Sequence, residues 1–343
     1  MIDSPLISII VPNYNSGEFV APFIDSVKKQ TYGNWELIFV DDGSSDNSLD
    51  IIREFSLNDT RINIYLRDKH LPKGACMCRN IGFELSKGEY VCFFDSDDLL
   101  PLDSLENRLK EFEHDQLLDF VVSPAISFRK VPFDIKKLVL GIPLFKDDLA
   151  MFLKRYRLPF GVWTNTYKRD FLRNNDIKWD VSLSSLQDSD FNIQCLLKKS
   201  NYSFSINPTP VYFWRISGNP NSITKKIKSK KNIDSQIYFY SKLYNIFKDT
   251  KYIKQLNRFG LTILLRCAHL NYNGDVSVLA SSKCDMLKYK ILNRIYKVSI
   301  LNKMFLLLNP LFFPFRILDE YLFFIRNRIV CVKYFKSLDK NVE

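Results

Sequence analysis

The chain has 343 residues, of which 46% are hydrophobic and 25% are charged, and this composition excludes an intrinsically disordered protein. Its seven cysteines are scattered, without the paired C-x-x-C spacing of a structural zinc site, so we expect reduced thiols and a cytoplasmic protein. The opening "MIDSPLISIIVPNYN" has no basic stretch before its short apolar run, so no signal peptide is expected.

The net charge of +11 is distributed unevenly along the sequence. Residues 1–224 hold 26 lysines and arginines against 30 aspartates and glutamates, a net charge of −4. Residues 225–343 hold 23 against 8, a net charge of +15. We therefore expect the first part to be able to hold a cation and the second part to face an anionic partner.

Apolar, β-rich runs alternate with helical spacing over the first 125 residues. Strands are predicted at 6–11, 35–40, 61–66, 90–95 and 119–123. Helices are predicted between them at 18–29, 46–57 and 103–113, where apolar residues recur at intervals of three and four. This alternation predicts an α/β fold with a mostly parallel central sheet flanked by helices.

The sequence after residue 145 changes in character. A short helix is predicted at the end of 160–176, a loop that leads into a helix over 185–200, and two short strands in 201–218. Further helices are predicted near 232–248, 250–272 and 283–298. The apolar stretch 304–325 is interrupted by prolines and an arginine, so it falls short of the roughly 20 apolar residues that a membrane span needs.

Polar motifs follow three of the predicted strands: "PNYNSG" (12–17), "DDGSSD" (41–46) and "DSDD" (95–98). Parallel sheets bind ligands beyond the carboxyl ends of their strands, so we expect the three motifs to converge there. Asp95 and Asp97 would point to the same side of a strand, because side chains alternate. Carboxylates this close repel one another, which suggests that a cation binds between them; a solvated turn is the alternative.

These motifs resemble those of the family 2 glycosyltransferases with a GT-A fold, of the bacterial polysaccharide and O-antigen type. The resemblance rests on "SIIVPNYNSGEFVAPFIDSVKKQTYGNWELIFVDDGSSDNS" (8–48), "GACMCRNIGFELSKGEYVCFFDSDDLLP" (74–101) and "QDSDF" (187–191). It implies a GT-A catalytic domain over 1–224, with a nucleotide-binding half of about 1–123 and an acceptor half of about 124–224. We expect the basic region 225–343 to be a helical extension that packs on this domain or associates with a membrane.

The resemblance implies a nucleotide-sugar site along the first two motifs. Pro12, Asn13 and Tyr14 are expected to line the base and ribose. One carboxylate of the pair Asp41 and Asp42, with Asp42 favoured, would accept the imide N–H of uracil, because an ionised carboxylate is an acceptor only.

The resemblance also assigns roles around the third motif. Arg79 matches a basic position near the nucleotide, although an arginine on a helix surface is the alternative. Asp95 and Ser96 are expected beside the nucleotide sugar. Asp97 is the best candidate ligand for Mn²⁺ or Mg²⁺, since hard cations prefer carboxylate and phosphate oxygens, and Asp98 is either a second ligand or a cap.

On the acceptor side, Asp188 of "QDSDF" matches the aspartate that removes the acceptor proton, with a helix N-cap as the alternative. Gln187 stands where the family more often has a glutamate. Asp190 is expected to support Asp188. No histidine precedes "SIT" at 222–224, so a histidine metal ligand is doubtful and Trp214 or Arg215 is expected to serve the acceptor.

The implied reaction is an inverting, metal-dependent transfer of a sugar from a nucleotide sugar, with a UDP-sugar expected, to a hydroxyl of a glycan or lipid-linked saccharide in O-antigen or capsule synthesis. The basic region allows peripheral attachment to the anionic inner face of the plasma membrane. A transferase acting on polyprenyl phosphate is one alternative. A nucleotidylyltransferase would need a glycine-rich basic loop after the first strand, and nucleic-acid binding is suggested only by the basic region; we expect no nucleic-acid partner.

Overall fold

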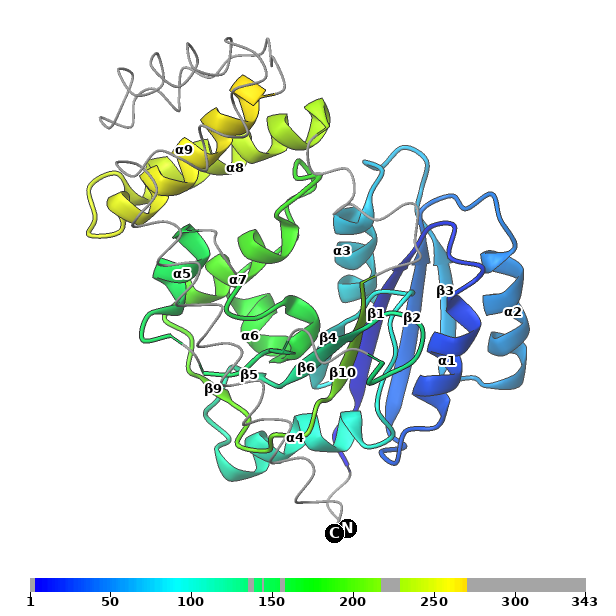
Figure 1. Ribbon diagram of the computed structural model, residues 1–343. Helices are drawn as coiled ribbons and strands as arrows, with labels where there is room; N and C mark the ends of the chain where they lie inside the picture. Colours follow the sequence, from blue (N-terminus) through cyan, green and yellow to red (C-terminus); the bar gives the residue numbers. More distant parts are fainter. Residues whose placement is uncertain (1–3, 135–138, 144, 155–157, 217–228, 270–343) are drawn as a thin grey trace. The chain divides into compact units, whose positions relative to one another are not determined.

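The structure is a computed structural model that describes residues 4–134, 139–143, 145–154, 158–216 and 229–269 (Figure 1). The chain forms two compact units, which we describe separately. Unit 1 comprises 1–146, 158–182 and 187–220. Unit 2 comprises 147–157, 183–186 and 221–343, so two short segments that precede residue 224 belong with the C-terminal helices. The helix predicted near 283–298 and the apolar stretch 304–325 lie outside the described residues.

Unit 1 is built on a seven-stranded sheet with the order β3-β2-β1-β4-β8-β5-β9. Its strands are β1 (Ile7–Asn13), β2 (Trp35–Asp41), β3 (Ile62–Leu66), β4 (Tyr90–Phe93), β5 (Phe120–Val122), β8 (Asn165–Lys168) and β9 (Tyr202–Phe204). The strands β3, β2, β1 and β4 are parallel, whereas β8 is antiparallel to both β4 and β5. The predicted α/β fold with a mostly parallel sheet is confirmed, and the antiparallel β8 was not predicted.

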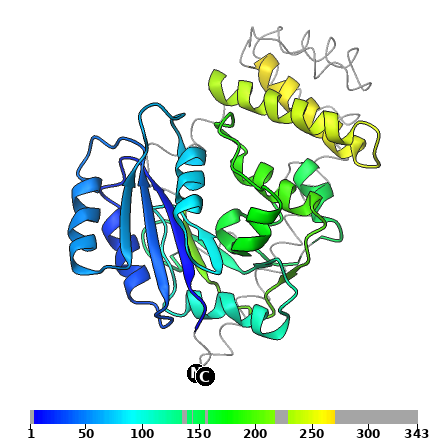
Figure 2. The ribbon, with the colours of Figure 1, turned by 180° about the vertical axis from the view of Figure 1, so that it is seen from behind.

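Helices cover both faces of this sheet at β1 and β2, and these two strands are largely apolar and buried. The helices α1 (Val20–Lys28) and α2 (Ser48–Asn58) lie on one face, and α3 (Ala75–Leu85) lies on the other (Figures 1 and 2). The chain crosses from β1 to β2 to β3 in one direction and returns past β1 to β4, so right-handed crossovers place α3 opposite the first two helices. In β1, Ile7, Ile9, Ile10 and Val11 are fully buried.

A second sheet in unit 1 has the order β10-β6-β7, formed by β6 (Ala125–Phe128), β7 (Val139–Leu140) and β10 (Tyr212–Arg215). A bridge between Leu99 and Phe213 ties β10 to the segment that follows β4. The two short strands predicted in 201–218 are therefore present, but they join different sheets. The remaining helical elements of unit 1 are α4 (Ser104–His114), η1 (Val162–Thr164), α6 (Arg169–Asn174) and α7 (Gln187–Leu197).

The described part of unit 2 contains α5 (Asp148–Lys154), α8 (Lys230–Phe247) and α9 (Ile253–His269), and α8 and α9 confirm the helices predicted near 232–248 and 250–272. The two long helices approach closely at Gly260, where a Cβ atom would lie 2.7 Å from the ring of Tyr240. Across the described ranges, no helix combines the length and apolar character required to cross a membrane.

A fully buried arginine fixes α4 against the segment that contains η1 and β8. The guanidinium of Arg108 donates hydrogen bonds to the carbonyl oxygens of Trp163 (2.8 Å), Thr164 (3.2 Å) and Asn165 (3.2 Å). It also lies 4.8 Å from the centroid of the Phe94 ring. Among the described residues, no carboxylate pairs with it. Backbone carbonyls, an aromatic face and the hydroxyl oxygens of Ser104 and Thr166, each 3.4 Å away, therefore compensate its burial.

Substitution of this arginine tests its contribution to stability. We expect Arg108→Met to lower the free energy of unfolding by about 2–4 kcal/mol, because three buried carbonyls lose their donor. Urea unfolding followed by circular dichroism measures the change. The control Arg53→Met alters an arginine whose side chain is 53% exposed, and it should change stability by less than about 0.5 kcal/mol. Equal effects of the two substitutions would contradict the assignment.

Candidate active site

The three polar motifs lie at one edge of the central sheet. The strands β1, β2 and β4 are parallel, and Asn13 and Asp41 are paired at the carboxyl ends of β1 and β2. The order of connection reverses between β1 and β4, which makes this edge the topological switch point of the sheet. The expected convergence of the motifs after β1, β2 and β4 is thus present in the topology.

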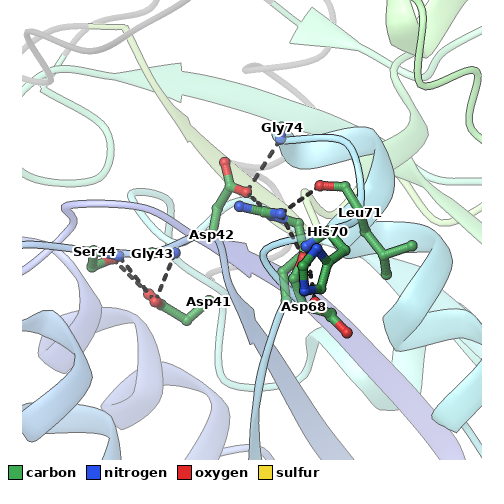
Figure 3. A network of polar contacts seen from close by, with 9 residues as sticks. Asp41, Asp42, Gly43, Ser44, Asp68, His70, Leu71 and Gly74 are labelled. Carbon is green, nitrogen blue, oxygen red and sulfur yellow. Dashed lines mark hydrogen bonds and ion pairs between the residues drawn. The ribbon is translucent and has the colours of Figure 1, made fainter.

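Asp41 forms the centre of the loop that follows β2 (Figure 3). Its buried carboxylate accepts hydrogen bonds from the Asn13 amide (2.7 Å), the Gly43 N–H (2.9 Å), the Ser44 N–H (3.0 Å) and the Ser44 hydroxyl (2.5 Å). Gly43 has a φ of +84°, a left-handed conformation that glycine adopts without strain. Asp41 and Asn13 are therefore engaged in building the loop.

Asp42 is held by an arginine that the sequence analysis did not single out. One carboxylate oxygen, Oδ1, accepts from Arg67 Nε at 2.5 Å and from the Gly74 N–H at 3.2 Å (Figure 3). The same guanidinium donates to the carbonyls of Asp68 (2.7 Å) and Leu71 (2.6 Å), and both charged side chains are 8% exposed. In the described part of the chain, no group donates to the second oxygen, Oδ2.

Arg67 and Tyr14 also belong to the side of the site that Asp42 forms. Arg67 directly follows β3, so its place at the carboxyl edge was the signal in the sequence that it belongs with the motifs. Of the three residues expected to line the base, Asn13 is buried and Pro12 is half-buried, whereas Tyr14 is 42% exposed. The ammonium of Lys73 lies 4.2 Å from the centroid of the Tyr14 ring.

Arg79 joins three separate segments at the other side of the site. Its guanidinium donates to Asp95 Oδ1 at 2.6 Å and to Gln187 Oε1 at 3.4 Å, and it lies 4.4 Å from the centroid of the Trp179 ring. Because Arg79 is only 7% exposed, the alternative of a surface arginine is wrong. Burial opposes its charge, but the carboxylates of Asp95 and Asp188 outweigh burial and raise its pKa.

The position of Arg79 depends on close packing of α3. A Cβ atom on Gly82 would lie 2.4 Å from Ile10 Cγ2, so glycine is needed for α3 to approach β1. The neighbouring Asn80 donates to the Trp179 carbonyl at 2.8 Å and accepts from the Trp179 N–H at 2.9 Å. Among the described residues, Arg79 Nε and Trp179 Nε1 are buried donors without a hydrogen-bond partner.

The acidic motif forms a turn and does not continue the strand. Because β4 ends at Phe93, the prediction of a strand to residue 95, with Asp95 and Asp97 on one side of it, is wrong. The turn includes a hydrogen bond from the Asp98 N–H to the Asp95 carbonyl at 3.4 Å. The Tyr212 hydroxyl accepts from the Asp95 N–H at 3.2 Å and donates to Asp98 Oδ2 at 2.7 Å, so β10 shapes the turn.

Asp98 is the most deeply buried carboxylate of the turn, at 1% exposure. Besides the Tyr212 hydroxyl, it accepts the Arg215 N–H at 2.7 Å, and Arg215 Nε donates to the Asp97 carbonyl at 2.6 Å. Burial first, and then the charges of Asp97 and Asp95, raise the pKa of Asp98 well above its usual range. Asp98 thus has two structural partners, and Asp95, Ser96 and Asp97 are half-buried.

The residues expected on the acceptor side lie in two places. Asp188 and Asp190 are both in the first turn of α7, where the helix dipole favours a carboxylate. Since α7 begins at Gln187, Asp188 is inside the helix and the N-cap alternative is wrong. Trp214 and Arg215 are both in β10, where Trp214 stacks on Trp163 and Arg215 donates hydrogen bonds to the acidic turn.

The two aspartates of α7 differ in burial, and the two residues of β10 contact aromatic rings. Asp190 is buried and accepts from the Gln194 side chain at 2.8 Å, whereas Asp188 is half-buried. The rings of Trp214 and Trp163 are stacked with centroids 5.4 Å apart. The guanidinium of Arg215 lies 4.4 Å from the centroid of the Phe128 ring.

The acidic turn fits a divalent cation that is shared with a ligand. Within the described residues, no cluster of three or more histidine, cysteine or acidic side chains could enclose a metal ion. Mg²⁺ is commonly bound by one or two carboxylates together with substrate phosphates, which does not require such a cluster. Asp97, half-buried in the turn beside Asp95, offers a carboxylate of this kind.

Solved structures share this fold. The structure superposes on that of S. aureus TarS 1–349 in complex with UDP-GlcNAc with a TM-score of 0.56, covering 85% of this chain and 91% of that chain at 18% identity. The predicted GT-A fold is thereby confirmed. Residues 8–174, just under half of the chain, match the Glycosyl transferase family 2 model, which supports the predicted family and enzyme class over that stretch. Asp188 lies beyond the matched residues.

Two curated relatives are similar over shorter stretches. The glycosyltransferase GlyG of Streptococcus pneumoniae serotype 4 is 37% identical over 148 residues, which cover 43% of this chain and 48% of GlyG. The UDP-Glc:alpha-D-GlcNAc-diphosphoundecaprenol beta-1,3-glucosyltransferase WfgD of Escherichia coli is 41% identical over 108 residues, 32% of this chain and 41% of WfgD. The chain thus spans about half the length of these relatives or less.

The contacts of Arg79 lead to a stability prediction. Arg79→Lys should lower the free energy of unfolding by about 1–2 kcal/mol, because one ammonium cannot replace a planar guanidinium that stacks on Trp179 and donates in two directions. Urea unfolding gives the change. The control Arg173→Lys alters an exposed arginine of α6 and should be neutral within about 0.5 kcal/mol. An equally neutral Arg79→Lys would contradict the joining role of this side chain.

Proposed function

We propose that the protein is an inverting, metal-dependent glycosyltransferase that moves a sugar from a UDP-sugar to a hydroxyl of a glycan or lipid-linked saccharide. The observation that supports this most strongly is the contact of Arg79 with both Asp95 and Gln187. Arg79 thereby joins the acidic turn after β4 to the start of α7. The turn is the proposed site of the leaving diphosphate, and α7 carries the proposed base.

The geometry of Asp42 supports uridine as the base of the donor. Arg67 and Gly74 already occupy Oδ1, which leaves Oδ2 as the oxygen available to a ligand. Uracil presents one imide N–H, which suits a single acceptor oxygen, whereas guanine presents two adjacent N–H groups that suit both oxygens of a carboxylate. Asp41 has four donors in the protein and is not needed for this role. Tyr14, exposed beside it, would line the base.

The acidic turn is the proposed place of the diphosphate. Asp97 would hold Mn²⁺ or Mg²⁺, Asp95 and Ser96 would face the ribose and sugar, and the bound cation would neutralise charge on the departing diphosphate. We assign Asp98 to shaping the turn, since Tyr212 and Arg215 bind it.

Asp188 is the proposed general base. It lies in the first turn of α7, directly after Gln187, which contacts Arg79. A carboxylate there would accept the proton of the acceptor hydroxyl as its oxygen attacks the anomeric carbon. A single displacement of the UDP group gives inversion of the anomeric configuration. Asp190, Trp214 and Arg215 would support this side of the site.

The name of one relative and the charge of the C-terminal region support a proposal for the cellular setting. WfgD, by its name, acts on a sugar linked to diphosphoundecaprenol, so a lipid-linked acceptor in surface polysaccharide synthesis, such as O-antigen or capsule, is a reasonable class for this chain. The net charge of +15 in residues 225–343 would attract anionic lipid heads at the inner face of the membrane. We therefore propose peripheral membrane association.

Substitution of the proposed base tests the reaction. We expect Asp188→Asn to lower transfer to acceptor about 10²–10⁴-fold, because an amide cannot accept the proton. Binding of UDP with Mn²⁺, measured as the rise in melting temperature, should be unchanged, and the wild-type product should have inverted anomeric configuration by NMR. Asp170→Asn, in the first turn of α6, is the matched control and should keep full transfer.

Two results would contradict this assignment. Retained anomeric configuration in the product would require a second displacement and a different mechanism. Near-normal transfer by Asp188→Asn would give the role of base to another residue, and Asp190→Asn would then be the next substitution to measure.

A further inference from the structure

The segment that leads into α7 is held by α8 of unit 2. Residues 183–186 belong to unit 2, although they directly precede Gln187 in the sequence. The backbone N–H groups of Ser184 and Ser185 both donate to the hydroxyl oxygen of Ser235, at 3.0 and 3.2 Å. In return, the Ser235 hydroxyl lies 3.3 Å from the Ser185 carbonyl, to which it donates.

A second residue of α8 holds the same two serines through their side chains. The Ser184 hydroxyl donates to Asn232 Oδ1 at 2.8 Å, and the Ser185 hydroxyl lies 3.3 Å from the Asn232 carbonyl oxygen. Asn232 and Ser235 are three residues apart, so they lie on one face of α8, and each is 5% exposed. We call these four residues, Ser184, Ser185, Asn232 and Ser235, the serine clamp.

The residue between the clamp and α7 has a strained backbone. Leu186 has a φ of +68°, in the left-handed region that a residue with a branched side chain rarely adopts. Such a conformation persists only where the structure on both sides imposes it. On one side of Leu186 is the serine clamp, and on the other side is Gln187, which contacts Arg79.

From these contacts we infer that Ser235 and Asn232 are positioning residues for Asp188. The clamp fixes Ser184 and Ser185, Leu186 turns the chain, and Asp188 follows two residues later in the first turn of α7. This role rests on the proposed function, since Asp188 is the proposed base. Neither α8 residue needs to touch the substrate. By this inference α8, which belongs to the basic C-terminal region, helps to position the proposed base.

The inference is tested with Ser235→Ala in the full chain, with Ser241→Ala as the matched control on the same helix. Hydrogen exchange measured by mass spectrometry should become faster over 183–188 in Ser235→Ala, because two backbone N–H groups lose their acceptor, and it should not change in Ser241→Ala. Transfer to acceptor should fall at least tenfold. Donor hydrolysis by water and the rise in melting temperature with UDP and Mn²⁺ should stay within twofold of wild type.

The ratio of transfer to donor hydrolysis separates positioning from simple loss of folded protein, which lowers both rates together. Leu186→Gly provides a second variant that keeps the four clamp residues and frees the strained turn, and it should lower the same ratio. An unchanged ratio in both variants, or unchanged exchange over 183–188 in Ser235→Ala, would overturn the inference. If Asp188→Asn itself keeps full transfer, the proposed base fails instead, and the exchange measurement still decides whether the clamp exists.

Discussion

The site depends above all on the burial of one charged side chain. A guanidinium that is 7% exposed must be compensated by nearby acceptors, and Arg79 finds them on the turn after β4 and at the start of α7. Asp95 is 16 residues from Arg79 in the sequence and Gln187 is 108 residues away, so the contacts of one buried guanidinium bring a near and a distant segment together. The close approach of α3 to β1, which Gly82 permits, sets where that place is.

The carboxylates of the acidic turn have different environments, and this gives them different tasks. Asp95 faces Arg79, and Asp98 is buried against Tyr212 and Arg215 from β10. The raised pKa of Asp98 reflects burial together with its acidic neighbours. The repulsion that makes the sequence "DSDD" unusual is therefore reduced by a fixed arginine on one side and by a second sheet on the other. Asp97, which is half-buried in the same turn, is the proposed ligand for a cation bound with the diphosphate.

The fold was predictable where local periodicity decides structure, and it was not where pairing between distant segments decides it. The apolar runs at 6–11 and 35–40 predicted β1 and β2, because a strand covered on both faces is apolar throughout. The antiparallel β8 has no such pattern. Its place follows from pairing with β4 and β5, which no spacing in the sequence reveals.

The same distinction applies to the site. The motifs indicated Asp42, Arg79 and Asp188 as candidates, and their roles remain proposals. The partner of Asp42, Arg67, and the partner of Arg79, Trp179, were not predicted, because each contact spans 25 residues or more. The strand was extended to residue 95 because the apolar run continues to Phe94. Tertiary contacts from Tyr212 end it earlier by drawing the backbone into a turn. The serine clamp, too, is invisible in the sequence, since its halves lie 47–51 residues apart.

A crystal structure with UDP and Mn²⁺ bound tests the central claim most directly, because the anomalous signal of manganese identifies the position of the cation. The account predicts a manganese peak between the Asp97 carboxylate and the diphosphate, with the imide N–H of uracil within hydrogen-bond distance of Asp42 Oδ2. The peak should be absent in crystals of Asp97→Asn grown in the same way. A manganese ion bound without Asp97, or a uracil ring away from Asp42, would contradict the account.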